Sequence, residues 1–514
     1  MKTSENKASE VVPVQPDAGS LYRSLPSLDE LLRGSSFEGL LSAEPRGLVI
    51  RAARFVLFEM KREIAAGRHT DATLNARIVA LSDAVACEIA RGSRYSLQRV
   101  INATGVVLHT NLGRAPLGAS ALAHVVEVAS GYCNLEFDLE TGERNRRDVH
   151  AEGLLLSLLR DVSGANQSVS NNTFANAPWA AVVVNNCAAA TFLALNSIAD
   201  GGEVIVSRGE LIEIGGGFRI PEILAKSGAV MREVGTTNRT RLSDFESAIT
   251  PETKLILRVH QSNFSMEGFI ERPTLEELVS LGERRNIPVF DDQGTGLMQS
   301  LRPLDIYSEP TLLESFCAGP GLIAASGDKL FGGPQCGLLI GTAALIERVR
   351  RNPLYRTYRV DKLAYAALEA TLMDHRSGRD TPVSRMINAA PVEIFKRCEE
   401  MANRVNCADL CAEAVPVPSL IGGGAAPSAR LQSTAVSLGH ATLAPQDLLS
   451  ALRRLDPPVV GRVSGERVLL DLRTVEPEFD ATLISLLQQA AQIGKPDLVI
   501  PHVETGVTTP GTGH

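Results

Sequence analysis

The stretch IAASGDKLFGGPQCG occupies residues 323–337 and contains a lysine shortly after an apolar run. The run predicts a buried strand that ends at Ser326, and Lys329 follows at the mouth of this strand. Gly332 and Gly333 come next and permit close approach of the backbone to another group. Most lysines are solvated surface cations. In this setting the sequence instead favours a lysine that leaves water and acts as a nucleophile toward a carbonyl group.

Pyridoxal phosphate (PLP) is the usual carbonyl partner of such a lysine, and its ring places a second demand on the chain. The pyridine nitrogen needs a carboxylate to stay protonated. The stretch VFDDQGTG at 289–296 ends a predicted strand with two aspartates. Strand alternation points them to opposite faces, so we predict that Asp292, two residues before Gly294, contacts the ring and that Asp291 faces away.

The phosphate of PLP needs backbone N–H groups at a helix N-terminus. VVVNNCAAATFLAL at 182–195 has the pattern of a strand, a polar turn and an Ala-rich helix, which places Asn186, Cys187 and Ala188 at the helix start. Ser326 can add a hydroxyl group. Turn, aspartate and lysine therefore follow one another on successive predicted strands, which is the order that a PLP site requires. The rival Lys362, in RVDKLAY, lies in a helical pattern without flanking glycines and indicates a solvated residue.

Residues 96–385 alternate short β-rich segments with helical patterns, which predicts a large α/β domain with a mostly parallel, doubly wound sheet. A helix is predicted over 274–285. Strands are predicted up to Val184 and over 203–206, 229–234, 254–260, 287–292, 322–326 and 337–341. The polar insertion at 166–178 indicates a surface loop.

The remaining regions flank this domain. Residues 1–19 are expected to be disordered, 20–95 to form a helical domain, 386–490 to form a small α/β domain, and 491–514 to form a flexible tail. In the helical domain, Ser27 with Glu30 and Ser35 with Glu38 have capping-box spacing. One helix is predicted from 48 to 66. A second, from about Thr70 to Gly92, carries an apolar stripe of Leu74, Ile78, Leu81, Val85 and Ile89.

The bulk composition narrows the class of protein. The chain has 514 residues, 44% of them hydrophobic, which suggests two or three domains. A net charge of −8 gives no overall basic field for nucleic acid. None of the eight cysteines forms a C-x-x-C pair, and Cys407 and Cys411 lie in a predicted helix. We therefore expect no disulfide framework, no metal site and a cytoplasmic location. No signal peptide or membrane span is expected.

Several longer blocks resemble bacterial selenocysteine synthase, the L-seryl-tRNA(Sec) selenium transferase family. These blocks are RVINATGVVLHTNLGRAPLG (99–118), VVNNCAAA (183–190), VSRGELIEIGGGFRIP (206–221), EVGTTNRT (233–240), SGDKLFGGPQCG (326–337) and LYRTYRVDK (354–362). The resemblance extends over roughly 20–490 and implies the fold of type I PLP-dependent enzymes. Cys187 and Cys336 depart from the family pattern, which has Asn and Ala there.

The resemblance implies a reaction on serine that is esterified to a dedicated tRNA. Lys329 takes the α-proton, the hydroxyl leaves by β-elimination, and selenophosphate adds selenium to the dehydroalanyl intermediate. Family members form homodecamers, rings of dimers in which neighbouring subunits share the tRNA and complete each active site. The N-terminal domain binds the tRNA, and the basic stretch 46–68 agrees mildly with this role, although a solvated helix face explains it equally well.

The family's active-site arginines correspond to Arg114, Arg356 and Arg359, whose planar forks suit an oxyanion donor. Without the family, the last two would indicate a solvated helix face. Asp328 either assists the leaving hydroxyl or orients Lys329. His109 and His260 are as consistent with structural as with catalytic roles. Two other functions stay open: a PLP-dependent lyase for a small amino acid or amino sugar phosphate without tRNA, and a tRNA-binding scaffold without activity.

Overall fold

The computed structural model describes residues 18–93, 95–163 and 177–493, and the chain divides into two compact units, Met1–Gln98 and Arg99–His514. Most of the predicted disordered N-terminus, nearly all of the insertion at 166–178 and nearly all of the predicted tail lie outside the described residues. Among the residues described, no helix combines the length and the apolar character that crossing a membrane would need.

The first unit is helical, as predicted. Its helices are α1 (Ala18–Ser24), α2 (Leu28–Arg33), α3 (Glu38–Ala43), α4 (Arg46–Ala65), α5 (Asp71–Val79) and α6 (Leu81–Ser93). They enclose a core around Phe37, Val49, Met60 and Leu74. The apolar stripe predicted from Thr70 packs here, with Ile78 only half-buried.

Two local predictions in this unit meet different outcomes. The Ser27–Glu30 capping box forms at the start of α2. The Ser35–Glu38 capping box does not form. Ser35 lies inside a 3₁₀ helix, and α3 begins only at Glu38, so that Phe37 occupies the N-cap position of α3. The single helix predicted from Thr70 was also wrong in length, since it is interrupted at Ala80 between α5 and α6.

A seven-stranded sheet forms the centre of the second unit, with the strand order β2-β10-β9-β8-β7-β3-β6. Only β10 runs antiparallel to its neighbours β2 and β9. The strands are β2 (Trp179–Val184), β3 (Glu203–Ser207), β6 (Val230–Val234), β7 (Thr253–Val259), β8 (Val289–Asp292), β9 (Leu322–Ser326) and β10 (Gly337–Thr342). All the predicted strands are confirmed, and so is the mostly parallel sheet.

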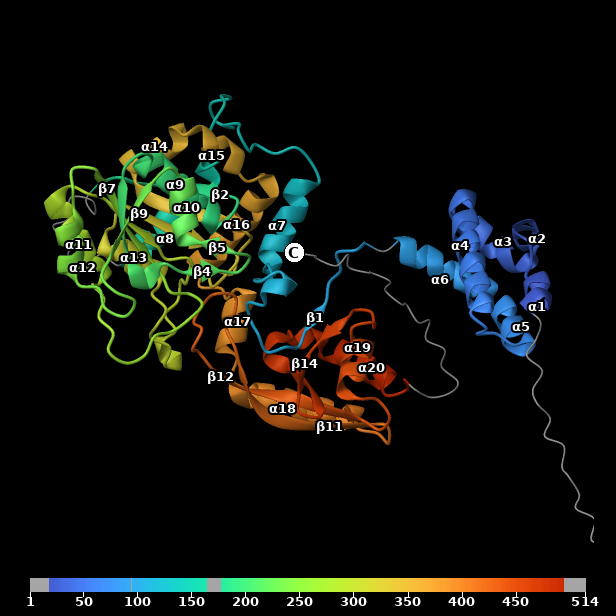
Figure 1. The fold of residues 1–514 in the computed structure, drawn as a ribbon. Helices are drawn as coiled ribbons and strands as arrows, with labels where there is room; N and C mark the ends of the chain where they lie inside the picture. Colours follow the sequence, from blue (N-terminus) through green and yellow to red (C-terminus); the bar gives the residue numbers. More distant parts are fainter. Residues whose placement is uncertain (1–17, 94, 164–176, 494–514) are drawn as a thin grey trace, which may run out of the picture. The chain divides into compact units, whose positions relative to one another are not determined.

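Helices cover both faces of this sheet (Figure 1). Val182 and Val184 of β2 face one apolar cluster, while the alternate Ala181 and Val183 face another. The first cluster includes side chains of α9 (Cys187–Ala199), α10 (Ile220–Lys226) and α14 (Ala343–Arg351), and the second includes those of α8 (Val149–Ser163) and α16 (Lys362–Arg376). The predicted helix at 274–285 is α12 (Leu275–Arg285). Burial on both faces explains why the strands are continuous apolar runs.

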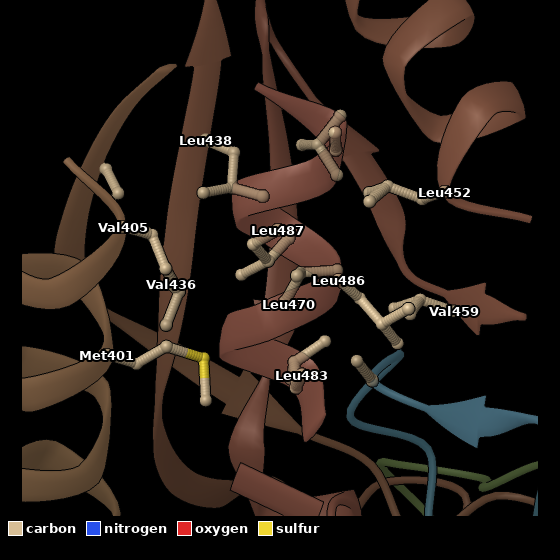
Figure 2. Packing of buried hydrophobic residues seen from close by; sticks show 14 of the residues in the cluster. Met401, Val405, Val436, Leu438, Leu452, Val459, Leu470, Leu483, Leu486 and Leu487 are labelled. Atoms are coloured by element: carbon tan, nitrogen blue, oxygen red, sulfur yellow. The ribbon is translucent and has the colours of Figure 1, made fainter. Parts of the chain in front are cut away.

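The C-terminal part of this unit has its own four-stranded antiparallel sheet, in the order β11-β12-β15-β14. Its strands are β11 (Leu410–Ser419), β12 (Leu431–His440), β14 (Arg462–Ser464) and β15 (Arg467–Asp471). The helices α18 (Pro391–Val405), α19 (Pro445–Leu452) and α20 (Asp480–Ala490) share one apolar core with it. Figure 2 shows Leu483 and Leu487 facing this core, with Met401 and Val436 nearby.

Two features of this part differ from the sequence prediction. Cys411 lies in β11 and not in a helix, and Cys407 lies in the turn before that strand. Two prolines, Pro416 and Pro418, weaken the strand pattern there. They are tolerated because β11 is an edge strand that pairs only with β12.

A short strand at the start of the second unit pairs with a strand of the C-terminal part. β1 (Ile101–Asn102) pairs in parallel with β13 (Val459–Val460). Next to this pair, Val107 N and Leu108 N donate to backbone carbonyls of Leu420 and Ile421. These contacts bring the segment that leads to Arg114 and the loop after β11 to the carboxyl ends of the central strands.

Candidate active site

A cavity of about 410 Å³ lies where the central parallel strands end. The turn after β2, the ends of β7, β8 and β9, and the loop at 110–114 all contribute to its walls. Carboxyl ends of parallel strands are where ligands bind in open α/β sheets. The cavity brings together eight of the ten residues that the sequence predicts for the site, namely Arg114, Asn186, Cys187, Ala188, Asp292, Ser326, Asp328 and Lys329.

Lys329 follows β9 in a tight turn. Gly327 N donates to Cys336 O at 2.9 Å, and Gly333 N donates to Gly327 O at 2.8 Å. The side chain of Lys329 lines the cavity and the residue is only 7% exposed. Within the described part of the chain, its ammonium group has no hydrogen-bond or ion-pair partner. The amine is therefore buried, yet free to react with a group in the cavity.

The carboxylate of Asp328, next to this lysine in the sequence, already has two partners within the protein. Asp328 Oδ1 accepts a hydrogen bond from Ser326 Oγ at 2.7 Å, and Asp328 Oδ2 lies 3.0 Å from Arg114 Nη1. Ala115 N also donates to Asp328 O at 3.2 Å, so the loop is fixed to the lysine turn by backbone as well as side chain. Ser326 Oγ can still donate a hydrogen bond to a phosphate, but its hydroxyl group then has to give up its hydrogen bond to Asp328.

Asp292 ends β8 and faces the cavity. Thr191 Oγ1 donates to Asp292 Oδ2 at 3.0 Å, and Cys187 Sγ donates to Oδ1 at 3.5 Å. Burial raises the pKa of Asp292 to about 6, against the opposing effect of these two hydrogen bonds. Asp291 faces away, as predicted, and its Oδ1 lies 2.8 Å from Arg258 Nη1. A cation beside Asp292, such as a protonated pyridine ring, would favour its ionised form.

The start of α9 offers a small anion site. Asn186 caps this helix by accepting a hydrogen bond from Ala189 N at 2.8 Å. The N–H groups of Cys187 and Ala188 have no acceptor among the described residues, and both residues line the cavity. Gly337 of β10 packs behind the turn, where a Cβ atom would lie 2.2 Å from Asn186 O. These features fit a phosphate group.

The two cysteines that depart from the family pattern are protonated thiols. Burial, aided by the charge of Asp292, raises the pKa of Cys187 well above its ordinary value. Burial raises the pKa of Cys336 to about 12. Because the thiolate is the reactive form, neither group is activated as a nucleophile.

His260 and Glu309 add a buried pair that the sequence did not predict. His260 lies at the end of β7 and lines the cavity, with Nε2 at 2.9 Å from Glu309 Oε2. Ala426 N donates to Glu309 Oε1 at 2.6 Å, which ties the C-terminal part to the cavity wall. Glu309 lies in an irregular segment without a motif, so no local signal could have identified it. His109 is not in the wall.

The comparisons with known proteins agree with this geometry. The family model of L-seryl-tRNA selenium transferases matches residues 100–476. The L-seryl-tRNA(Sec) selenium transferase of Geobacter sulfurreducens is 41% identical over 479 residues, which cover 92% of this chain and 100% of that protein. The same enzyme of Aquifex aeolicus is 40% identical, with the same 92% and 100% covered. The chain belongs to the L-seryl-tRNA(Sec) selenium transferase family.

A solved structure supports the fold independently. D-glucosaminate-6-phosphate ammonia-lyase aligns with a TM-score of 0.51 and 17% identity, over 77% of this chain and 96% of that one. The fold class predicted from the sequence, that of type I PLP-dependent enzymes, is thereby confirmed.

The resemblance to selenium transferases indicated three active-site arginines, and the structure places them in two different cavities. Arg114 contacts Asp328 in the cavity. Arg356 and Arg359 line a different cavity of about 420 Å³, which has no lining residue in common with the first. There Arg359 Nη1 lies 3.4 Å from Glu136 Oε1, and Arg147 Nε lies 2.6 Å from the same oxygen.

The helical unit shows the basic face that the sequence predicted only mildly. On α4, Arg51, Arg54, Lys61 and Arg62 are exposed, and Arg62 Nη1 lies 2.9 Å from Glu59 Oε1. Phe55 and Phe58 of the same helix are also exposed, at 42% and 57%. These residues are compatible with RNA binding and equally with a solvated face.

Proposed function

We propose that this protein converts seryl-tRNA(Sec) to selenocysteinyl-tRNA(Sec), with selenophosphate as the selenium donor and PLP as cofactor. The observation that carries the proposal is the match of nearly the whole chain to selenium transferases, with a free, buried Lys329 in the cavity. The catalytic chemistry takes place in the cytoplasm, where charged tRNA is available.

The residues of the cavity suit PLP at its carbonyl group, its ring nitrogen and its phosphate. Lys329 Nζ would bind its carbonyl carbon, Asp292 its ring nitrogen, and the N–H groups of Cys187 and Ala188 its phosphate, assisted by Asn186 and Ser326. When bound, PLP supplies an electron sink for a carbanion at the serine α-carbon.

The chain's own residues then carry the proton transfers and the positioning. Lys329 Nζ, once the seryl amine has replaced it at the carbonyl carbon, is free to take the α-proton as general base, since no group among the described residues pairs with this amine. Asp328 holds Arg114 at the cavity wall. The guanidinium of Arg114 can then stabilise the negative charge that develops on the oxygen leaving the β-carbon. Thr191 and Cys187 fix the orientation of the Asp292 carboxylate.

The donor anion requires further cations, and Arg356 and Arg359 supply them in our proposal. Because these arginines lie outside the cavity of their own chain, a neighbouring copy has to bring them to it. A homodecamer built as a ring of dimers provides such neighbours. The exposed apolar side chains of Leu122, Val126 and Tyr132, on α7 (Ala119–Ala129) and just after it, support a contact between copies.

The alternative function for the PLP-binding domain is that of a PLP-dependent lyase that acts without tRNA. The likeness to the ammonia-lyase establishes the fold alone, whereas the selenium transferases match along their full length. The relatives thus favour the tRNA-dependent reaction.

The test is to incubate the PLP-loaded protein with seryl-tRNA(Sec) and selenophosphate and to identify the amino acid released from the tRNA. Selenocysteine supports the proposal, and Lys329→Ala serves as the inactive control. Unchanged serine on a tRNA confirmed as charged would overturn it.

A further inference from the structure

We propose that a second cavity, next to the lysine cavity, binds the 3′-terminal nucleotides of the aminoacylated RNA. This inference rests on the proposed function. The seryl group is joined directly to the ribose of the terminal adenosine. When its α-carbon lies near Lys329 Nζ, the nucleoside therefore has to lie immediately beside the lysine cavity.

The second cavity has the required position. It measures about 520 Å³ and shares His260 with the lysine cavity, so the two cavities are neighbours. Glu309 lines the second cavity and holds His260 Nε2 at 2.9 Å. The arginine cavity with Arg356, in contrast, shares no residue with the lysine cavity.

Aromatic side chains in this cavity suit a nucleobase. Phe264 and Tyr307 both line it, with 37% and 69% of their surfaces exposed. Stacking of a base on such a ring is tolerant of sequence and contributes about 1–3 kcal/mol per base. The terminal bases of an unpaired RNA end can therefore be bound there without an extended pairing surface.

One cation in the cavity is free for a phosphate. Arg258 Nη1 is 2.8 Å from Asp291 Oδ1, and Arg302 Nη2 is 2.5 Å from Glu314 Oε1. Arg272 lines the same cavity, and no carboxylate within the described parts of the chain lies within ion-pair distance of it, since Glu210 acts on it only at longer range. Its charge is thus available to a backbone phosphate of the RNA.

A buried hydroxyl gives an independent sign of a ligand. Ser315 lines this cavity and is 1% exposed, and its Oγ has no hydrogen-bond partner among the described residues. Buried polar groups in native proteins are normally paired. A ribose hydroxyl or a base edge in the cavity would provide the missing partner.

The experiment measures both turnover and nucleotide binding for Phe264→Ala and Arg272→Ala. Each is expected to raise KM for seryl-tRNA(Sec) by about five- to a hundredfold while kcat changes little, because the reacting groups stay in place. The same variants should weaken binding of the trinucleotide CpCpA to the PLP-loaded protein, measured by calorimetry, by a similar factor.

Matched controls come from exposed residues of the same types outside the cavity. Phe269→Ala and Arg284→Ala should leave KM and CpCpA binding unchanged. Unchanged KM and CpCpA binding in Phe264→Ala and Arg272→Ala, with an active wild type, would overturn the nucleotide site. An inactive wild type that still loses CpCpA binding on substitution would overturn the proposed reaction and retain the site.

Discussion

Arg114 Nη1 lies 3.0 Å from Asp328 Oδ2, and the two residues are 214 positions apart in the chain. Arg114 has a left-handed backbone, with φ of 62°, so its side chain is directed by an unusual turn. Asp328 immediately precedes Lys329. The pair therefore couples the loop at 110–114 to the turn that holds the reactive amine.

This pair predicts a non-additive effect of substitution. Arg114→Ala and Asp328→Asn should each lower kcat, and the double variant should lose less than the sum of the two losses. Residues in direct contact typically couple by about 0.5–3 kcal/mol. Single-turnover rates on charged tRNA measure the effect. Additive losses would show that the two residues act separately, and full turnover in Asp328→Asn would exclude a role for this carboxylate.

Gly337 is predicted to control cofactor binding through close packing. A Cβ atom there would lie 2.2 Å from Asn186 O, which would push β10 away from the start of α9. Gly337→Ala should weaken PLP binding and lower the free energy of unfolding by about 1–3 kcal/mol. Absorbance titration with PLP and chemical denaturation check this. Gly153→Ala, at an exposed position inside α8 where a Cβ meets nothing within 4 Å, should leave PLP binding unchanged and raise the free energy of unfolding by about 0.5–1 kcal/mol.

Glu210 is predicted to make stability depend on pH. Its Oε2 accepts a hydrogen bond from Val259 N at 3.1 Å, and burial raises its pKa from 4.5 to about 7. Because the fold favours the protonated form, its stabilising contribution is fully present below pH 4.5 and is lost as the pH rises through 7. From pH 4.5 to 8, the free energy of unfolding should fall by about 3 kcal/mol more in the wild type than in Glu210→Gln.

Denaturation curves at intervals across this pH range test the prediction for Glu210. Glu252→Gln, at an exposed position, provides the control and should follow the wild type at every pH. Parallel curves for the wild type and Glu210→Gln would contradict the assignment.

Mixing inactive subunits tests whether a neighbour supplies the second set of arginines. Lys329→Ala and the double variant Arg356→Ala/Arg359→Ala should each be inactive alone. Mixed oligomers should regain turnover, because some cavities then have an intact lysine and a neighbour with intact arginines. Mixing Lys329→Ala with Asp292→Asn should restore nothing, since both residues belong to one cavity. Verified mixed oligomers without activity would refute the arrangement.

Much of the central sheet and of the lysine cavity could be predicted from sequence because both depend on local patterns. Strands buried on both faces are continuous apolar runs, and each cofactor residue follows such a run. Thr191 and Glu309 could not be predicted in this way, because their partners Asp292 and His260 lie 101 and 49 residues away. β11 was missed because edge pairing, which permits its prolines, is a property of the whole sheet.

The pairing of β1 with β13 has a consequence for synthesis on the ribosome. Ile101 emerges early, yet its partner Val459 is added 358 residues later. Arg114 follows β1 closely, so the loop that carries it cannot be anchored on both sides until translation is nearly finished. Chains released before residue 459 should therefore lack a complete lysine cavity. Such incomplete chains should not react with charged tRNA.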